Sequence, residues 1–132
     1  MVLNKQSLII LILIGGISIC ATALNDPENG FRNLKVLPKN TSAKELSRIM
    51  VDDFTDGLGV SCGFCHKEDK ASHQLDYVSD ENPEKQIARK MMRMAIRINR
   101  RYFKSEHAVI GDSSLVVTCY TCHKGTPVPA NQ

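Results

Sequence analysis

One five-residue pattern occurs twice in the chain and limits its possible folds more than any other feature. The two copies are Cys62-Gly63-Phe64-Cys65-His66 and Cys119-Tyr120-Thr121-Cys122-His123. Cys-x-x-Cys-His is the attachment motif of c-type haem. Its two thiols add to the vinyl groups of one porphyrin, and the histidine that follows is placed to bind the iron. Two copies in 132 residues therefore predict two covalently bound haems c.

Three other uses of paired cysteines compete with haem attachment. A zinc ribbon separates its two pairs by roughly 15–20 residues, whereas 53 residues lie between Cys65 and Cys119. A thioredoxin-like dithiol needs a βαβ setting, and the flanking sequences show no such pattern. Disulfides suit exported domains but do not explain a histidine after each pair. Haem attachment is thus favoured, and a zinc-stapled interaction module is the main alternative.

Residues 1–23 have the pattern of an export signal. Lys5 supplies the positive charge, residues 8–14 are an unbroken apolar run, and Ala21-Thr22-Ala23 fits a cleavage site. Cleavage after Ala23 would remove Cys20 and leave four cysteines, all in the haem motifs. The alternatives are an uncleaved membrane anchor and a lipid on Cys20. We expect an exported, periplasmic protein in which residues 24–132 form one dihaem cytochrome c domain.

Two segments before the first motif have recognisable patterns. Residues 31–38 are short and partly alternating, which predicts an extended lead-in that lays Leu34 and Val36 on an apolar surface. Ser42 and Glu45 then have the spacing of a capping box and begin a helix. Its apolar residues share one face: Leu46, Ile49, Met50 and Phe54. The helix is expected to end at the glycines of residues 57–59.

A second helix is predicted from Asn82-Pro83, as cap and first residue, to about Phe103. It has an apolar stripe and, beside it, a basic stripe. The apolar stripe is Ile87, Met91, Met94 and Ile98, and the basic stripe is Arg89, Arg93, Arg97 and Arg100. Arginines in such a stripe are either solvated or paired with haem propionates or with an acidic partner. Residues 67–82 read as a polar loop in which His73 is solvated.

Composition agrees with a haem protein and gives no sign of nucleic-acid binding. The formal net charge is only +3, aromatic residues make up 5% of the chain and there is no tryptophan. A domain of this size has a limited core of its own. Two porphyrins would therefore supply much of the apolar interior.

Six tracts between residues 33 and 129 form a pattern more specific than either haem motif. They are Asn33-Leu34-Lys35-Val36-Leu37, Met50, residues 58–66, residues 88–94, Ile98-Asn99 and residues 117–127. This pattern resembles the cytochrome c subunit of photosynthetic reaction centres, and specifically one two-haem half of that four-haem protein. The resemblance implies electron transfer by haems that each take one histidine and one methionine.

Carried onto this chain, the resemblance implies a ligand set for each iron. His66 and Met50 would bind the first iron, and His123 and Met91 the second, with Met94 as the alternative to Met91. The chain has two haem motifs where the family's protein has four. His107 stands near the place where that protein offers a histidine to its other half, so it is either a loop residue or a ligand to a haem of another subunit.

These features predict a mostly α, small multihaem cytochrome c with two helix–loop–CxxCH repeats. Its expected role is to carry single electrons between redox protein partners, with assembly with other cytochromes as an option, and it is not expected to be an enzyme. Filled axial positions leave no open iron for a substrate, and a thioether ligand raises the potential. The alternative within redox chemistry is a dihaem enzyme in which one haem stays open.

Overall fold

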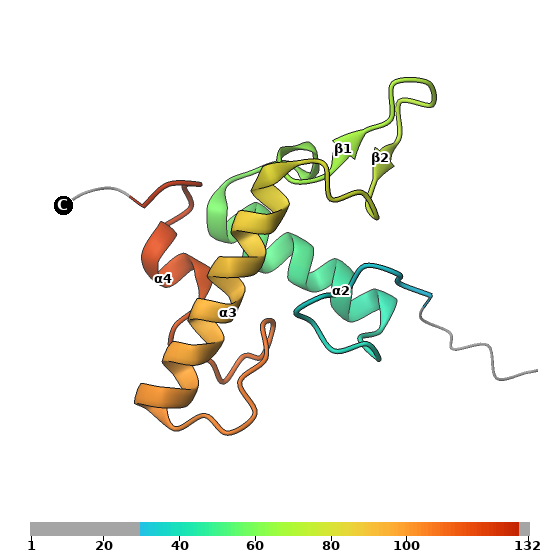
Figure 1. Ribbon diagram of the computed structural model, residues 1–132. Helices are drawn as coiled ribbons and strands as arrows, with labels where there is room; N and C mark the ends of the chain where they lie inside the picture. The colour runs from blue at the N-terminus through green and yellow to red at the C-terminus, as the bar shows by residue number, and fades with distance from the viewer. Residues whose placement is uncertain (1–29, 130–132) are drawn as a thin grey trace, which may run out of the picture. The chain divides into compact units, whose positions relative to one another are not determined.

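Helices carry most of the regular structure of the protein (Figure 1). The computed structural model describes residues 30–129, so the predicted export signal, Cys20 and cleavage site lie outside the described residues. The elements are α2 (Ala43–Ile49), the π-helical η1 (Met50–Asp56), the 3-10 helix η2 (Cys62–Phe64), β1 (Lys67–Glu68), β2 (Leu75–Asp76), α3 (Pro83–Phe103) and α4 (Cys119–His123). The predicted mostly α class is confirmed. No helix in the described residues is long and apolar enough to cross a membrane.

The first helix begins where its capping residue predicts. The Ser42 hydroxyl accepts a hydrogen bond from the Glu45 N–H at 3.2 Å, which satisfies one of the free donors at the start of a helix. α2 then continues directly into η1, where the winding changes to π-helical at Met50. π-helical turns are rare and are frequent at functional sites. The change therefore falls at the residue that the sequence nominates as a haem ligand.

A tight turn after η1 brings the two halves of the chain into contact. Gly59 has φ +65°, and a Cβ there would lie 2.2 Å from the Gly125 carbonyl oxygen. Beside it, the Gly125 N–H donates to the Gly57 oxygen at 3.2 Å. Only glycine allows this approach, because it tolerates a positive φ and has no Cβ. The turn that precedes the first haem motif is thereby attached to the turn that follows the second.

α3 has the predicted limits but buries a different face from the one that its apolar stripe suggested. Asn82 caps it by accepting from the Glu84 N–H at 3.2 Å, and Lys104 ends it in the left-handed conformation. The buried face includes Met92, Ala95 and Asn99. The predicted stripe is largely exposed instead: Ile87 by 45%, Met91 by 44% and Met94 by 47%. α3 therefore has an exposed apolar stripe and a mixed buried face, in which Lys85, Arg89 and Asn99 accompany Met92 and Ala95.

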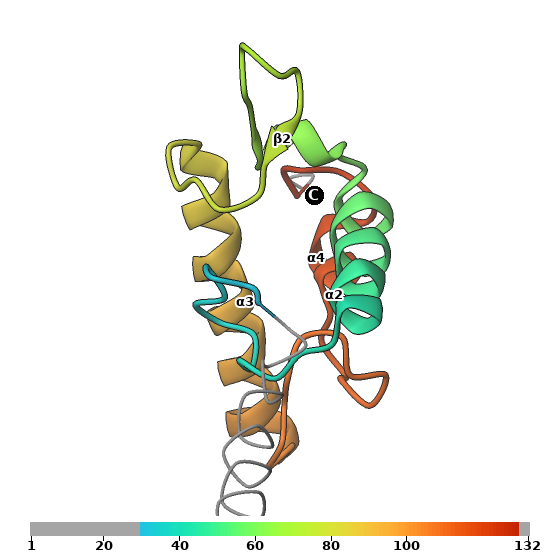
Figure 2. The ribbon, with the colours of Figure 1, turned by 90° about the vertical axis from the view of Figure 1, so that its right-hand side faces the viewer.

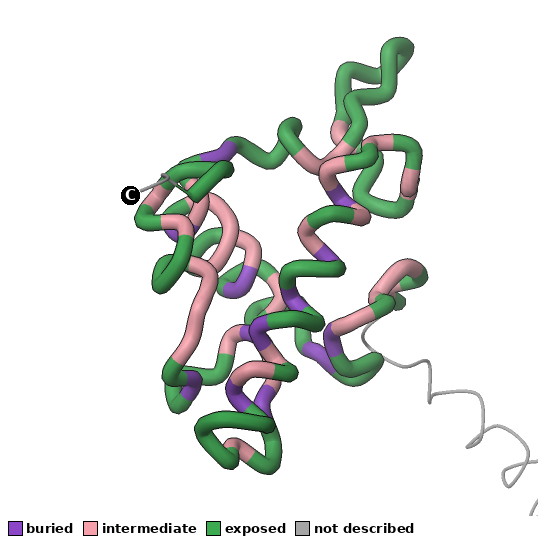
Figure 3. Tube along the Cα trace, turned by 60° about the vertical axis from the view of Figure 1, so that its left-hand side comes forward, coloured by how far each residue is buried: buried purple, intermediate pink, exposed green. Residues whose placement is uncertain are grey.

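The core lies between α2, α3 and the segment that leads to α4. Figure 2 shows α3 on one side, with α2 and α4 on the other, and Figure 3 shows buried positions along one side of α3. The buried core residues are Leu37, Ile49, Met92, Ala95, Ala108, Ile110 and Leu115. Leu34 and Val36 pack against this cluster, which confirms the predicted role of the lead-in.

A charged network holds the polar segment of residues 67–82 against α3. Arg89 is buried and donates to the Asp80 carboxylate at 2.7 Å and to the Asn33 carbonyl at 3.0 Å. Lys85 is also buried and donates to the Tyr77 and Ser79 carbonyls at 2.8 and 2.6 Å. Of the predicted basic stripe, Arg89 is thus neither solvated nor open to a partner. Buried charges of this kind require paired or hydrogen-bonded surroundings.

The rest of residues 67–82 is a short hairpin, where the sequence predicted only a loop. β1 and β2 pair antiparallel, with Lys67 opposite Asp76 and Glu68 opposite Leu75. The hairpin tip is exposed (Figure 3). His73 lies in this tip with φ 54°, and its Nδ1 is 3.1 Å from the Glu68 carboxylate. The predicted solvated state of His73 is confirmed by its 81% side-chain exposure.

We expect the Asp80 network to make stability depend on acidity. Hydrogen bonds from Lys35, Arg89 and Asn33 hold the pKa of Asp80 well below its ordinary value. A lowered folded pKa stabilises the protein above the unfolded value of about 3.9, and this contribution is lost as the pH falls further. Asp80→Asn should therefore lower the urea midpoint of unfolding at pH 7, and its difference from wild type should shrink below about pH 4.

Asp56→Asn is the control for this experiment, because Asp56 is exposed and forms no ion pair within the described residues. A difference between Asp80→Asn and wild type that stays constant down to pH 2 would contradict the assignment.

The close approach of Gly59 and Gly125 gives a second test of the fold. Gly59→Ala should lower the free energy of unfolding by about 2 kcal/mol or more, because a left-handed φ and a steric clash act together. Gly30→Ala is the matched control, since a Cβ there has no heavy atom within 4 Å. Chemical denaturation of the two variants measures the effect. Equal stability of the two variants would show that the turn at Gly59 can move away from Gly125 at no cost.

Candidate haem sites

The first motif is a short turn attached to the start of α3. Within it, the His66 N–H donates to the Cys62 oxygen at 3.0 Å, and the Phe64 N–H donates to the Ser61 oxygen at 3.0 Å. The side chain of Asn82, which caps α3, donates to the Phe64 carbonyl at 2.9 Å. One asparagine therefore begins the second long helix and also fixes the first haem motif.

The His66 ring is half-buried and has only one ring nitrogen that a metal could reach. Its Nδ1 is buried and has no hydrogen-bond partner, which leaves Nε2. The Tyr77 ring packs edge-on against the imidazole, with 4.9 Å between centroids. Burial, followed by the positive charges of Lys85 and Arg89, lowers the pKa of His66. The ring is therefore neutral at neutral pH, which is the form that binds metals.

The second motif is a short helix that holds its histidine in one tautomer. The Thr118 N–H donates to the Thr121 hydroxyl at 3.0 Å at the start of α4. At its end, Nδ1 of His123 lies 3.0 Å from the Thr126 carbonyl oxygen. A carbonyl can only accept, so Nδ1 carries the proton and Nε2 has a free lone pair. A hydrogen bond of this type orients the ligating imidazole in metal sites.

The lead-in to the second motif is fixed by Asn99 of α3. Asn99 is completely buried. Its Nδ2 donates to the Val117 carbonyl at 2.7 Å and to the Ala95 carbonyl at 2.9 Å. Its Oδ1 accepts from the N–H groups of Val116 and Val117 at 2.9 and 3.1 Å. This side chain satisfies the backbone of a segment that has no strand partner, and it positions Cys119 two residues later.

Asn99 and Thr126 are functional residues that our sequence analysis did not assign. In the sequence, Asn99 and Thr126 belong to tracts that match the family pattern, and no individual role is predicted for either residue. Asn99 lies off the predicted apolar stripe of its helix, so the periodicity gave no signal for it. No local sequence pattern predicts the hydrogen bond between the His123 ring and the Thr126 carbonyl.

The cysteines have the properties that haem attachment requires. All four are free thiols, so no disulfide closes either pair. Burial raises the pKa of Cys65, and burial together with Asp53 raises the pKa of Cys119 to about 11. A redox dithiol depends on the opposite, a lowered thiol pKa. In residues 30–129, moreover, no three His, Cys, Asp or Glu side chains gather as a metal site, so the two pairs do not meet as a zinc ribbon would require.

The proposed methionine ligands have different environments. Met50 is half-buried and packs against the core cluster. Met91 and Met94 lie on the exposed apolar face of α3. Cys119 lies against the end of η1: a Cβ on Gly57 would be 3.4 Å from the Cys119 Cβ. The structure thus brings the second motif to the first helix, and the first motif to the start of α3.

Large apolar side chains are exposed in both motifs and on α3. They are Phe64 (40%) and Tyr120 (56%) in the motifs, and Ile87, Met91 and Met94 of α3. A porphyrin bound beside them would cover apolar surface of this kind. With the free thiols and the neutral His66, the donor set matches haem c.

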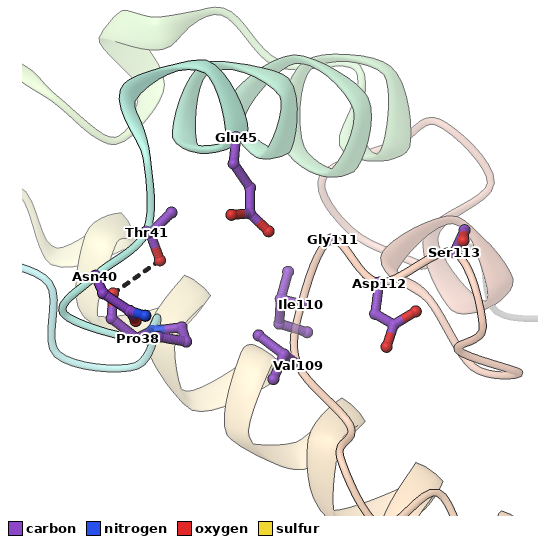
Figure 4. A pocket seen from close by; sticks show the side chains of 9 residues that line it. All are labelled: Pro38, Asn40, Thr41, Glu45, Val109, Ile110, Gly111, Asp112 and Ser113. Carbon is purple, nitrogen blue, oxygen red and sulfur yellow. Dashed lines mark hydrogen bonds between the residues drawn. The ribbon is translucent and has the colours of Figure 1, made fainter.

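A hollow elsewhere in the protein does not correspond to these sites. It has a volume of about 480 Å³ and lies between the start of α2 and residues 109–113 (Figure 4). Its lining residues are Pro38, Asn40, Thr41, Glu45, Val109, Ile110, Gly111, Asp112 and Ser113. It contains no cysteine, histidine or methionine and is therefore unsuited to binding haem iron.

Comparison with known proteins decides the family. The family model of the photosynthetic reaction centre cytochrome c subunit matches residues 17–132. The chain belongs to this family. It is therefore a c-type cytochrome, and haem c is the cofactor that the family implies. The resemblance seen in the sequence is confirmed.

Three relatives illustrate the match within the reaction-centre cytochrome family. The chain is 33% identical over 101 residues to the photosynthetic reaction center cytochrome c subunit of Rubrivivax gelatinosus, covering 75% of this chain and 24% of that protein. The corresponding subunit of Thermochromatium tepidum is 33% identical over 100 residues, covering 75% and 22%. Cytochrome c-554 of Chloroflexus aurantiacus is 30% identical over 95 residues, covering 72% and 20%. The chain thus spans less than a quarter of the length of these relatives. No solved structure matches it significantly.

The role of Asn99 can be tested separately from haem ligation. Asn99→Leu should lower the free energy of unfolding by about 3 kcal/mol, because backbone groups of Val116 and Val117 lose their buried partner. Chemical denaturation of haem-loaded protein measures this loss. Asn99→Asp keeps the acceptor oxygen but places a buried carboxylate against the Ala95 and Val117 carbonyls, so it should destabilise the protein at pH 7 and less so at a pH where the carboxyl is protonated. A leucine variant as stable as wild type would contradict the assignment.

Proposed function

We propose that this protein is an exported dihaem c-type cytochrome that passes single electrons between redox protein partners. The observation that carries the proposal is the duplicated motif, each copy a short helical segment with two free cysteines and one histidine. Membership of the reaction-centre cytochrome family supports electron transfer as the role.

Each half of the protein supplies one attachment site and two axial ligands. Cys62 and Cys65 would hold the first haem, with His66 and Met50 on its iron. The corresponding set for the second haem is Cys119, Cys122, His123 and Met91. The haem supplies one-electron redox chemistry when bound, and the protein sets how readily the electron is gained.

The residues around the motifs can tune the two sites differently. Lys85 and Arg89 are buried near His66, and both lower its pKa through their positive charge. The same positive charges favour the reduced, less positive state of the first site. His123 instead has the Thr126 carbonyl on its Nδ1, which makes the imidazole a stronger electron donor.

A redox enzyme with one open haem is the second candidate function. The feature that keeps this candidate open is the pair Met91 and Met94, one turn apart on α3, because the motif itself does not fix which methionine, if either, would bind the second iron. A carrier keeps both irons six-coordinate, whereas an enzyme would let a small molecule displace methionine. The carrier remains our conclusion because the relatives are reaction-centre cytochrome subunits and a cytochrome c-554.

Partners and location are the finer parts of the proposal. Because the relatives are reaction-centre subunits and a cytochrome c-554, we propose periplasmic redox proteins as donor and acceptor. Attachment to the membrane would come through an uncleaved N-terminus or a lipid on Cys20. Assembly with other cytochromes is an extension of this scheme. His107 is exposed, which is compatible with reaching a haem of another subunit, and unchanged spectra and assembly of His107→Ala would remove that role.

The mass of the mature protein tests the proposal directly. Expression with a periplasmic haem-attachment system should give residues 24–132 plus two haems. Cys119→Ser/Cys122→Ser should carry one haem, which assigns the second site. Two haems with a diacylglyceryl increment on Cys20 would instead show a lipid anchor. A mass with no covalent haem, in a host that modifies a control cytochrome, would end the proposal.

Carbon monoxide binding tests the methionine ligands. Reduced wild-type protein should not bind carbon monoxide if both irons are six-coordinate. Met50→Ala and Met91→Ala should each open one iron to carbon monoxide and lower its potential, because the thioether ligand that raises the potential is lost. Met94→Ala decides between the two methionines of α3: wild-type behaviour of this variant assigns Met91, whereas carbon monoxide binding by Met94→Ala and not by Met91→Ala assigns Met94. Rapid binding by wild-type protein would favour the enzyme.

A further inference from the structure

A basic hollow on α3 is not used by either haem site. We call it the basic groove. It has a volume of about 600 Å³, and its lining residues are Lys35, Val36, Arg93, Ile96, Arg97, Arg100 and Arg101. Four arginines and one lysine therefore surround two partly buried apolar side chains.

The positive charge of the groove is a local feature. Removal of residues 1–23 would leave 16 basic against 14 acidic side chains, so the protein as a whole is nearly neutral. Lys35 is already paired with Asp80. Within residues 30–129, Arg93, Arg97 and Arg101 form no ion pair. This part of the surface therefore presents uncompensated charge to solvent.

The basic groove and the proposed second haem ligand are on the same helix. Arg93 and Arg97 occupy a different side of α3 from the exposed stripe with Met91 and from the core face with Met92. Arg100 is oriented by a hydrogen bond to the Ala108 carbonyl at 3.3 Å. A molecule held in the groove would thus lie against the helix that carries Met91.

From this arrangement we infer that the basic groove is the docking site of an acidic redox partner protein. The inference rests on the proposed electron-transfer function and adds the chemistry of the partner. Arginine binds carboxylates through two parallel hydrogen bonds and is enriched at protein interfaces. Val36 and Ile96 give the apolar centre that an interface needs within its charged rim. A flat lipid surface would leave the hollow unfilled, and inorganic phosphate is much smaller than it.

Two oxidants of opposite charge test the groove in haem-loaded protein. Ferricyanide is an anion that takes one electron from a reduced haem and becomes ferrocyanide, and tris(phenanthroline)cobalt(III) is a cation that also takes one. In Arg93→Glu/Arg97→Glu, oxidation by ferricyanide at low salt should slow by about tenfold, and oxidation by the cobalt complex should speed up. High salt should remove both effects. Arg100 is kept because it contacts Ala108.

Lys44→Glu/Lys70→Glu is the matched control, because both lysines are exposed, lie outside the groove and give the same change in net charge. It should change either rate by less than about twofold. Equal effects of the two double variants would overturn the inference, since the rates would then follow net charge alone. Arg93→Gln/Arg97→Gln repeats the test with neutral side chains in case charge reversal disturbs folding.

Competition identifies the class of occupant. Polyglutamate, as an acidic polypeptide, should inhibit ferricyanide oxidation of wild-type protein and have little effect on Arg93→Glu/Arg97→Glu. Equal inhibition by pyrophosphate at the same charge concentration would indicate a small-anion site. Binding to phosphatidylglycerol vesicles that polyglutamate does not displace would indicate a lipid surface. Either result would overturn the acidic protein partner.

Haem content, absorption spectrum and midpoint potential of every variant are measured first. A loss of covalent haem in wild type would defeat the proposed function itself. A lowered covalent haem content or an altered absorption spectrum in both Arg93→Glu/Arg97→Glu and Arg93→Gln/Arg97→Gln, and not in the lysine control, would show that these arginines hold a haem. That result would overturn the docking inference and leave the cytochrome intact. A shifted potential alone is the expected effect of charge reversal near a redox centre.

Discussion

The contact between the glycine turn after η1 and the turn after α4 is the constraint on which the arrangement of the haem motifs depends. The carbonyl of Gly125 occupies the space that a side chain on Gly59 would need, and the Gly125 N–H donates a hydrogen bond to the Gly57 carbonyl. Each motif begins or ends within a few residues of this contact. The relative position of the two motifs is therefore fixed by a contact between two backbone segments. Side-chain packing alone would leave more freedom, because side chains can change rotamer and backbone carbonyls cannot.

α3 is the second determinant, because it serves both ends of the chain. Asn82 at its start binds the first motif, and Asn99 near its end binds the segment before the second. Between them, Arg89 connects it to Asp80 and to the N-terminal lead-in. One helix therefore carries restraints to both haem motifs and to the segment before α2. Such an arrangement suits a protein with few buried apolar residues. A small domain buries little apolar surface, and the polar contacts of α3 supply part of the stabilisation that a larger core would give.

The sequence predicted what depends on local signals. Ser42 and Asn82 cap helices where their side chains can bind the first free N–H groups. The predicted limits of α3, Pro83 and Phe103, are those that the structure has. What it missed depends on residues far apart. The burial of Arg89 needs Asn33, 56 residues away. The buried face of α3 could not be chosen because Lys85, Arg89 and Asn99 make it more polar than the exposed stripe, and they bond to segments outside the helix. The change to π-helical winding at Met50 has no sequence signature that we recognise.

For the sites, the motif predicts the cysteines and histidines. The hydrogen bond that orients His123 could not be predicted, because it involves the backbone carbonyl of Thr126 and no side chain.

The separation of the buried face of α3 from its exposed apolar stripe has a consequence for how such a protein can diverge. Met92 and Ala95 face the core, whereas Ile87, Met91 and Met94 are exposed. A substitution on the buried face alters mainly the free energy of unfolding, and one on the exposed stripe would alter mainly the surroundings of the proposed second haem site. Selection can therefore adjust redox potential and thermal tolerance on one helix in separate steps, without each improvement in one eroding the other.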